Sequence, residues 1–254
     1  MKYTFGTSEA ATLRLEQIAE LLNPMSKTFI RKYVIESVGS AIDLGCGPGF
    51  TTNMLYEATG CSNVYGIDSA SNFLKIAAET FKHCTFINHD VTKTPLPVHA
   101  DVMYARFLLS HLLDVVELVK RWVEELPNKG KLIIEELEDI ETDNPVFQRY
   151  LAINIGLVAS QGAVLYVGKT VADGVYDADV LCKECISIPV TNYQAATWFY
   201  PNTVTIWEQE QYVLDNINAK VRKELSDELL RIKQSHDTME AGTWKLRRLV
   251  LQRR

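Results

Sequence analysis

Three glycines within five residues, Gly45-Cys46-Gly47-Pro48-Gly49, constrain the fold of this chain most strongly, because its 254 residues include only 13 glycines. The cluster follows a short apolar run at 40–44 and precedes a segment of helical spacing at 50–59. Glycine tolerates positive φ angles and, having no Cβ, lets a ligand approach the main chain. The cluster therefore predicts either a ligand-binding loop or a tight turn between a strand and a helix.

Short apolar runs alternate with helical patterns around this cluster. We expect strands at 40–44, 64–68, 85–88, 101–104 and 131–137, and helices at 50–59, 72–82 and 107–125. Strands that alternate with helices in this way predict an α/β fold with a parallel sheet and helices on both faces. The rest of the chain predicts two helices within 8–38 that are interrupted at Pro24, helices at 145–160 and 208–235, and an edge strand at 244–252.

Acidic residues lie in or after the first three expected strands. Asp43 lies inside the first strand, Asp68 ends the second, and Asp90 follows the third. The carboxyl ends of parallel strands form the usual ligand crevice of such sheets, where Asp68 could accept hydrogen bonds from ribose hydroxyls and Asp90 one from an adenine amine. Each has a structural alternative: Asp43 could orient loop amides, Asp68 could cap a helix, and Asp90 could hold a turn.

The ordered motifs IDLGCGPGF (42–50), VYGID (64–68), INHDV (87–91), DVMYARFLLSHLLD (101–114) and LPNKGKLIIEEL (126–137) resemble those of class I S-adenosylmethionine-dependent methyltransferases. The segment before residue 25 is similar to the N-terminal helices of bacterial small-molecule methyltransferases in this superfamily. The resemblance implies a Rossmann-like, doubly wound, mostly parallel seven-stranded sheet with a helical N-terminal segment and a lid insertion. It also implies S-adenosyl-L-methionine as cofactor and methyl transfer to an oxygen, nitrogen or carbon nucleophile of a small, apolar or aromatic metabolite.

On this basis we divide the chain into four segments. They are an N-terminal helical cap (1–39), a cofactor-binding core (40–138), a helical lid insertion (139–181), and the remainder of the core with C-terminal edge strands (182–254).

The resemblance also assigns cofactor contacts. The glycines would let the backbone approach the methionine moiety, Asp68 would bind the ribose, and Asp90 and Val91 would contact the adenine. Arg106 would lie beneath the sulfonium and help hold the carboxylate end, and Tyr3 and Arg14 could close the pocket. The complete expected set is Asp43, Gly45, Cys46, Gly47, Gly49, Asp68, Ser69, Asp90, Val91, Arg106, Tyr3 and Arg14.

The methyl acceptor is expected beyond the fourth and fifth strands. His111 is the candidate general base, and the alternative is that it packs its helix. Glu135, Glu136 and Glu138 end the fifth strand, and we expect them to face the substrate, with Glu136 the chosen contact. The lid is rich in aromatic rings, of which Phe147, Tyr150 and Tyr166 are the chosen substrate contacts; the alternative is that such rings form the lid's own core.

Composition narrows the expected partners to a small molecule. A formal net charge of −6 argues against a nucleic-acid or anionic-membrane surface. The five cysteines form an odd set typical of free thiols, and the N-terminal sequence lacks the pattern of a secretory signal, so we expect a cytoplasmic location. Cys182 and Cys185 form a single C-x-x-C pair, too few ligands for a zinc site, so no metal is expected. We expect a monomer or a homodimer.

Three other functions share parts of this pattern. A NAD-dependent oxidoreductase would need G-x-G-x-x-G, whereas Phe50 follows G-x-G-x-G here. A protein or RNA methyltransferase is the second alternative, although Tyr104-Ala105-Arg106-Phe107 stands where enzymes that methylate adenine or glutamine amides carry Asn/Asp-Pro-Pro-aromatic. The third is a relative that binds the cofactor without catalysis.

Overall fold

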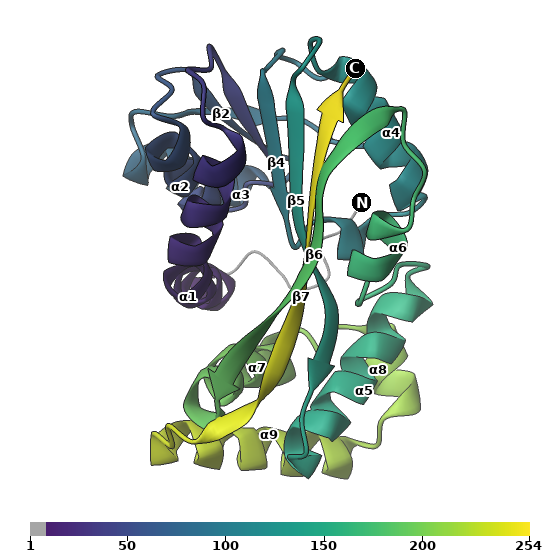
Figure 1. The fold of residues 1–254 in the computed structure, drawn as a ribbon. Coiled ribbons are helices and arrows are strands. Elements are labelled where there is room, and N and C mark those ends of the chain that lie inside the picture. The colour runs from purple at the N-terminus through teal and green to yellow at the C-terminus, as the bar shows by residue number, and fades with distance from the viewer. Residues whose placement is uncertain (1–8) are drawn as a thin grey trace.

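A seven-stranded sheet organises the protein in a computed structural model that describes residues 9–254 (Figure 1). Its order is β3-β2-β1-β4-β5-β7-β6; the first five strands are parallel, and β7 runs antiparallel to both β5 and β6. The strands are β1 (Ala41–Leu44), β2 (Val64–Asp68), β3 (Thr85–Asn88), β4 (Val102–Arg106), β5 (Lys131–Glu141), β6 (Ala178–Thr191) and β7 (Glu240–Arg253). The expected Rossmann-like, mostly parallel sheet is confirmed.

Helices cover both faces of the sheet and gather around its lower end (Figure 1). They are α1 (Glu9–Tyr33), α2 (Phe50–Thr59), α3 (Ser71–Thr80), η1 (Leu109–His111, a 3-10 turn), α4 (Val115–Glu125), α5 (Pro145–Ser160), α6 (Gly168–Ala172), α7 (Asn192–Thr205), α8 (Gln211–Asn216) and α9 (Ala219–Ser235). One apolar cluster joins α1 and α2 to one face, and a second joins α4 and α6 to the other. A third cluster joins α5, α7 and α9 to the lower parts of β6 and β7.

The centre of the sheet places the ligand crevice. All four residues of β1 are buried, as expected for a central strand covered on both faces. Since β1 lies between β2 and β4, the strand order reverses at this point, and the carboxyl ends of these strands open onto one crevice.

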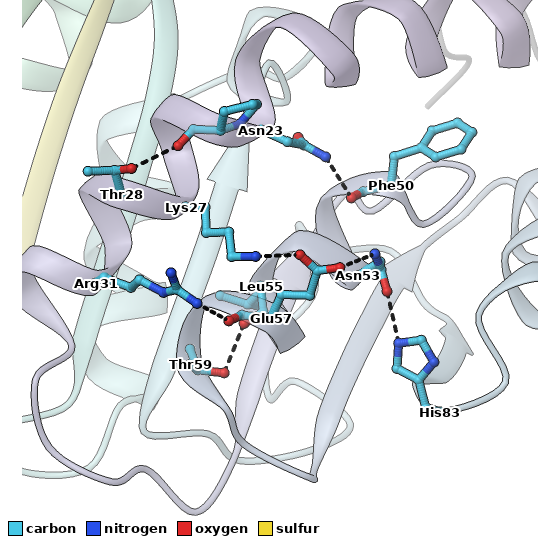
Figure 2. A network of polar contacts seen from close by, with 11 residues as sticks. Asn23, Lys27, Thr28, Arg31, Phe50, Asn53, Leu55, Glu57, Thr59 and His83 are labelled. Carbon is cyan, nitrogen blue, oxygen red and sulfur yellow. Dashed lines mark hydrogen bonds and ion pairs between the residues drawn. The ribbon is translucent and has the colours of Figure 1, made fainter.

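Helix α1 is continuous, so the interruption predicted at Pro24 is wrong. Proline removes one backbone donor, and the carbonyl left without a partner belongs to the exposed Glu20, where water can satisfy it. Figure 2 shows how α1 is fixed to α2: Lys27 pairs with Glu57 at 2.6 Å, and the Asn23 side chain donates to the Phe50 carbonyl at 3.1 Å. These contacts hold α1 beside the helix that follows the glycine loop.

Other boundaries also differ from the prediction. The helix expected at 107–125 begins only at Val115, after η1 and a positive φ of 49° at Asp114. The helix expected at 208–235 is divided into α8 and α9, and α9 starts at an Asn218 cap that accepts from Lys220 N at 2.8 Å. Strand β6 and helix α7 were not predicted as elements, and the segment boundaries proposed at 138 and 181 fall inside β5 and β6.

Candidate functional site

A cavity of about 250 Å³ lies between the carboxyl ends of β1, β2, β4 and β5 and the helices α1, α5 and α7. Twelve of the residues singled out from the sequence line it: Arg14, Gly45, Cys46, Gly47, Asp68, Ser69, Asp90, Val91, Arg106, His111, Glu136 and Tyr150. Tyr3 lies outside the described residues. Asp43, Gly49, Phe147 and Tyr166 are not in the cavity wall.

The glycine loop takes its shape from positive φ angles of 68° at Gly45, 51° at Gly47 and 88° at Gly49. A Cβ at Gly45 would lie 2.5 Å from Leu108, and one at Gly49 would lie 2.9 Å from Ala77, so both glycines are needed for packing. A Cβ at Gly47 would lie no closer than 3.8 Å to another side chain. Because Gly47 lines the cavity, its missing side chain leaves the main chain open to a ligand.

Asp43 supports this loop from beneath. It is 1% exposed, and one carboxylate oxygen accepts from the Thr51 and Thr52 hydroxyls at 2.6 and 2.7 Å. Burial raises the pKa of Asp43 to about 6, against the opposing effect of these two hydroxyls. The contacts tie β1 to the first turn of α2, so Asp43 orients the loop from outside the cavity.

Asp68 links the end of β2 to the glycine loop. One of its oxygens accepts from Gly47 N at 2.9 Å, and the other accepts from Ala70 N at 2.7 Å. Burial raises the pKa of this carboxyl above its ordinary value, and the backbone donors oppose the shift. Since each carboxylate oxygen can accept more than one hydrogen bond, both can still accept donors from a ligand in the cavity.

Asp90 and Val91 form the next part of the rim. Asp90 Oδ1 accepts from the Thr92 backbone N and hydroxyl at 3.0 and 2.7 Å, and the hydroxyl is the largest cause of a lowered pKa of Asp90. Val91 is buried, and its carbonyl accepts from Trp122 Nε1 at 3.0 Å. The lowered pKa keeps the Asp90 carboxylate in its charged form at the cavity.

Arg106 is the last residue of β4 and lies at the junction of the sheet with α1. The residue is 9% exposed, and its guanidinium donates to Ser26 Oγ at 3.1 Å and to Asn23 Oδ1 at 2.8 Å. Both of these hydrogen-bond partners are neutral; the charge of Arg106 also acts to lower the pKa of the nearby Asp43, and it would attract an anion in the cavity.

A second buried arginine connects α1 with the lower helices. Arg14 donates to Asn202 Oδ1, and Asn202 Nδ2 donates to Tyr150 Oη at 2.6 Å. Asn202 was not anticipated from the sequence, because its place beside Arg14 depends on α1 meeting α7.

His111 lies in η1, is partly buried and lines the cavity. Burial, reinforced by the charge of Arg14, lowers the pKa of His111 to about 4. The imidazole is therefore neutral near pH 7.

The three glutamates at the end of β5 have different surroundings. Glu135 faces away from the cavity: it is fully buried and accepts from Tyr104 Oη at 2.6 Å and Arg248 Nε at 2.8 Å. Glu138 pairs with Arg247 at 2.5 Å. Of the three, Glu136 alone lines the cavity, so the expectation that all three face the substrate is wrong for Glu135 and Glu138.

Glu136 also fixes the chain after β4. Its Oε1 accepts from the backbone N of Leu108 and of Leu109, each at 2.7 Å, which holds the start of the short turn η1. Burial raises the pKa of Glu136 to about 8, although the two backbone donors oppose the shift.

Aromatic rings form the cavity wall opposite the glycine loop. Phe107, Tyr150, Trp198, Phe199 and Trp244 line it, and Tyr150 stacks on Phe199 with ring centroids 4.2 Å apart. Phe147 packs behind this wall, edge-on to Phe199. Phe107, Trp244 and Asn154 were missed because they enter the wall from three separate parts of the chain.

Among residues 9–254, no group of three or more metal-binding side chains occurs. Cys182 and Cys185 are free thiols on β6. Within the same described part of the chain, no helix has the length and apolar character needed to cross a membrane.

Comparison with known proteins gives consistent matches in sequence and fold. A family described as "Methyltransferase domain" matches residues 42–134. Trans-aconitate 2-methyltransferase from Klebsiella pneumoniae (strain 342) is 30% identical over 146 residues, which are 58% of this chain and 57% of that protein. The match thus spans little more than half of this curated relative.

Among solved structures, YcgJ from Bacillus subtilis matches with a TM-score of 0.55 and 13% identity, over 91% of this chain and 99% of that chain. Coclaurine N-methyltransferase, bound to N-methylheliamine and S-adenosylhomocysteine, has a TM-score of 0.54 and 12% identity, over 91% of this chain and 72% of that chain. At these identities the similarity concerns the fold alone.

Proposed function

We propose that this chain, whose residues 42–134 form a class I S-adenosylmethionine-dependent methyltransferase domain, methylates a small molecule with an apolar or aromatic body. When bound, the cofactor supplies an activated methyl group on a sulfonium, so the protein mainly has to bind and orient both partners.

The environment of Asp68 carries this proposal. Its two oxygens are fixed by Gly47 N and Ala70 N, and both remain able to accept the two hydroxyls of a ribose. The side-chain-free surface at Gly47 lies beside them and fits the close approach of the cofactor. The residues present are therefore chemically suited to S-adenosylmethionine.

The other rim residues receive roles on the same grounds. Asp90 would accept a hydrogen bond from the adenine amine, and Val91 would contact the adenine ring. Arg106, whose partners in α1 are neutral, would hold the carboxylate of the methionine moiety. His111 is a weak base with its lowered pKa, so we assign it to shaping the wall rather than to removing a proton.

The acceptor would occupy the side lined by aromatic rings. Trp198, Phe199 and Trp244 offer apolar surface that would exclude water and bind a flat or hydrophobic body. Trans-aconitate, the substrate named for the relative, is a tricarboxylate and would bring negative charge to a wall that contains Glu136. It is therefore a useful test compound.

The test incubates the purified protein with methyl-labelled S-adenosylmethionine and a fractionated extract of cellular metabolites, with trans-aconitate as a separate arm. The expected result is S-adenosylhomocysteine formation together with a mass gain of one methyl group on an apolar or aromatic compound. Asp68→Ala is the control and should abolish both signals. Labelling of protein or RNA alone, or no product from any fraction, would overturn the proposal.

A further inference from the structure

Two buried oxygen atoms of the cavity-lining residues have no hydrogen-bond partner within the described chain. They are Glu136 Oε2 and Asn154 Oδ1, on residues that are 1% and 2% exposed. A buried polar atom without a partner costs free energy, and native proteins usually avoid it. Asn154 Oδ1 is an acceptor, and so is Glu136 Oε2 when its carboxyl is ionised, so a ligand with hydrogen-bond donors would remove that cost.

The existing contacts fix which atom of each side chain remains unpaired. Glu136 Oε1 is held by the two backbone donors of Leu108 and Leu109, and Oε2 is thereby left over. Asn154 Nδ2 donates to the Tyr150 carbonyl at 2.8 Å within α5, which leaves Oδ1 as the unpaired atom. One residue comes from β5 and the other from α5, so the two acceptors approach the cavity from different elements.

The surroundings of these atoms are mainly apolar. Leu137, Ile140, Leu151, Leu165, Trp198 and Trp244 line the same cavity. Burial is the cause that raises the pKa of Glu136, and the causes that oppose it are backbone donors rather than a cationic side chain. A ligand carboxylate would find no donor at Glu136 Oε2 or Asn154 Oδ1 and would face a buried carboxyl.

We propose that the ionised Glu136 carboxylate, through Oε2, and Asn154 Oδ1 form a subsite of two acceptors that selects ligands carrying a hydroxyl or amino group on an apolar body. The inference rests on the proposed function in taking this ligand as the methyl acceptor. Glu136 is then the residue that orients the donor group of the substrate, and Asn154 provides the second polar contact.

The substitution Glu136→Gln tests the proposed subsite directly. Because the backbone donors of Leu108 and Leu109 require an oxygen at the Oε1 position, the glutamine oxygen will stay there. Its NH₂ group will then occupy the position of Oε2, which changes an acceptor into a donor. The variant should therefore invert the ligand preference rather than only weaken binding.

The probes are four naphthalene derivatives of one shape: 2-naphthol, 2-naphthylmethylamine, 2-methoxynaphthalene and 2-naphthoate. Calorimetry at about pH 9, above the pKa of about 8 of the Glu136 carboxyl, measures their affinity for the whole chain saturated with S-adenosylhomocysteine. The wild type should bind the naphthol or the amine at least tenfold more tightly than the methoxy compound, as expected for one hydrogen bond to a buried carboxyl. The two donor-bearing arms show whether the hydroxyl or the amine is preferred.

In Glu136→Gln, the affinity for the naphthol and the amine should fall at least tenfold, and that for the methoxy compound should rise. Glu138→Gln, on the same strand but paired with Arg247 outside the cavity, is the matched control and should retain the wild-type order. Asn154→Leu keeps a similar volume, removes Oδ1, and should narrow the gap between donor-bearing and donor-free probes. It also supplies the test if Glu136→Gln fails to fold.

Equal affinities of the wild type for the naphthol and the methoxy compound would overturn the subsite, as would preference for the naphthoate. The subsite would also be overturned if both Glu136→Gln and Asn154→Leu bound the four probes in the same order of affinity as the wild type. Binding of S-adenosylhomocysteine, titrated first in each variant, separates this failure from failure of the proposed function. If it binds and the probes show no preference, only the subsite is wrong.

Discussion

The two sides of the cavity are built in different ways. On the side of β1, β2 and β3, short loops present backbone groups, and Asp68 binds Gly47 N and Ala70 N to make a rim from one stretch of chain. On the side of α5 and α7, the wall consists of side chains, including Tyr150, Trp198 and Trp244, from elements far apart in sequence. The first construction suits an invariant cofactor, and the second can change its ligand through single substitutions.

Adjacent glutamates of β5 show the same contrast within one strand. Glu135 and Glu136 are both buried, yet Glu135 is paired with Arg248 and Tyr104, whereas Glu136 keeps one oxygen without a partner. A buried carboxyl whose two oxygens are both paired serves the structure, whereas one with an unpaired oxygen can bind a ligand. The following predictions test this contrast and the one between the two sides.

The largest effect is expected from Glu135→Gln, which removes the nearer carboxylate of the buried Arg248 and leaves it only the half-exposed Glu184 at 3.7 Å. We expect the free energy of unfolding, measured by urea denaturation, to fall by roughly 3–5 kcal/mol. Glu136→Gln breaks no ion pair and should change this free energy near pH 6 by less than about 1 kcal/mol. Equal losses in the two variants would contradict the distinction between them.

The next largest effect is expected for the rim of the cavity where Asp68 accepts from backbone N–H groups. Asp68→Ala removes the acceptor of Gly47 N and the proposed acceptor of the ribose hydroxyls. The affinity for S-adenosylhomocysteine should fall about 100-fold or more, because two hydrogen bonds to a charged group are lost.

Asp101→Asn is the matched control, because Asp101 also accepts two backbone donors, Gly39 N and Ser40 N, but lies outside the cavity wall. It should lower stability and leave the affinity for S-adenosylhomocysteine within about twofold, a difference below 0.5 kcal/mol. A similar loss of affinity in both variants would show that Asp68 acts only through the fold.

A smaller effect is expected at Gly47, where a Cβ has room within the protein but would face the ligand. Gly47→Ala should weaken S-adenosylhomocysteine binding about tenfold, or about 1.4 kcal/mol. Gly60→Ala is the control: Gly60 also has a positive φ, of 65°, and no atom within 4 Å of its Cβ position. Both variants should lose about 1 kcal/mol of stability from backbone strain, and only Gly47→Ala should lose affinity.

The last effect is a pH dependence of stability that originates at Glu136. Its pKa is raised from 4.5 to about 8, so between these values the folded protein holds a proton that the unfolded chain releases. The stability contributed by this group is complete below about pH 4.5 and is lost as the pH rises toward 8.

Comparison with Glu136→Gln isolates this contribution, because Asp43 and His111 titrate in both proteins. The wild type should lose stability relative to the variant by up to about 1 kcal/mol per pH unit between pH 5 and 8. Parallel stability curves for the two proteins would show that the carboxyl is ionised throughout this range.

The sequence predicted correctly those strands, helices and loops that are formed by consecutive residues of the chain. β2, β3, α2 and α5 occur at their predicted bounds, and the glycine loop adjoins Asp68 as expected. The acceptor side was only partly anticipated, because Trp244 and Asn154 line one cavity only through the long pairing of β5 with β7 and the apolar packing that joins α5 to β7. No local pattern encodes such a meeting.

Two missed elements nevertheless left local signals. In β6, Ile186, Ile188 and Val190 alternate as in a strand, and Pro189 is tolerated because β6 lies at the sheet edge. Helix α7 begins with a capping box in which Thr191 and Gln194 exchange hydrogen bonds, although Pro201 inside the helix obscures the pattern.

The central claim is that the glycine-loop side of the cavity binds S-adenosylmethionine. Calorimetric titration of the purified protein with S-adenosylhomocysteine and, in parallel, with NAD tests it most directly. The account predicts saturable binding of one S-adenosylhomocysteine per chain and at least 100-fold weaker binding of NAD, a difference of about 2.7 kcal/mol. Preference for NAD, or no binding of S-adenosylhomocysteine by the folded protein, would contradict it.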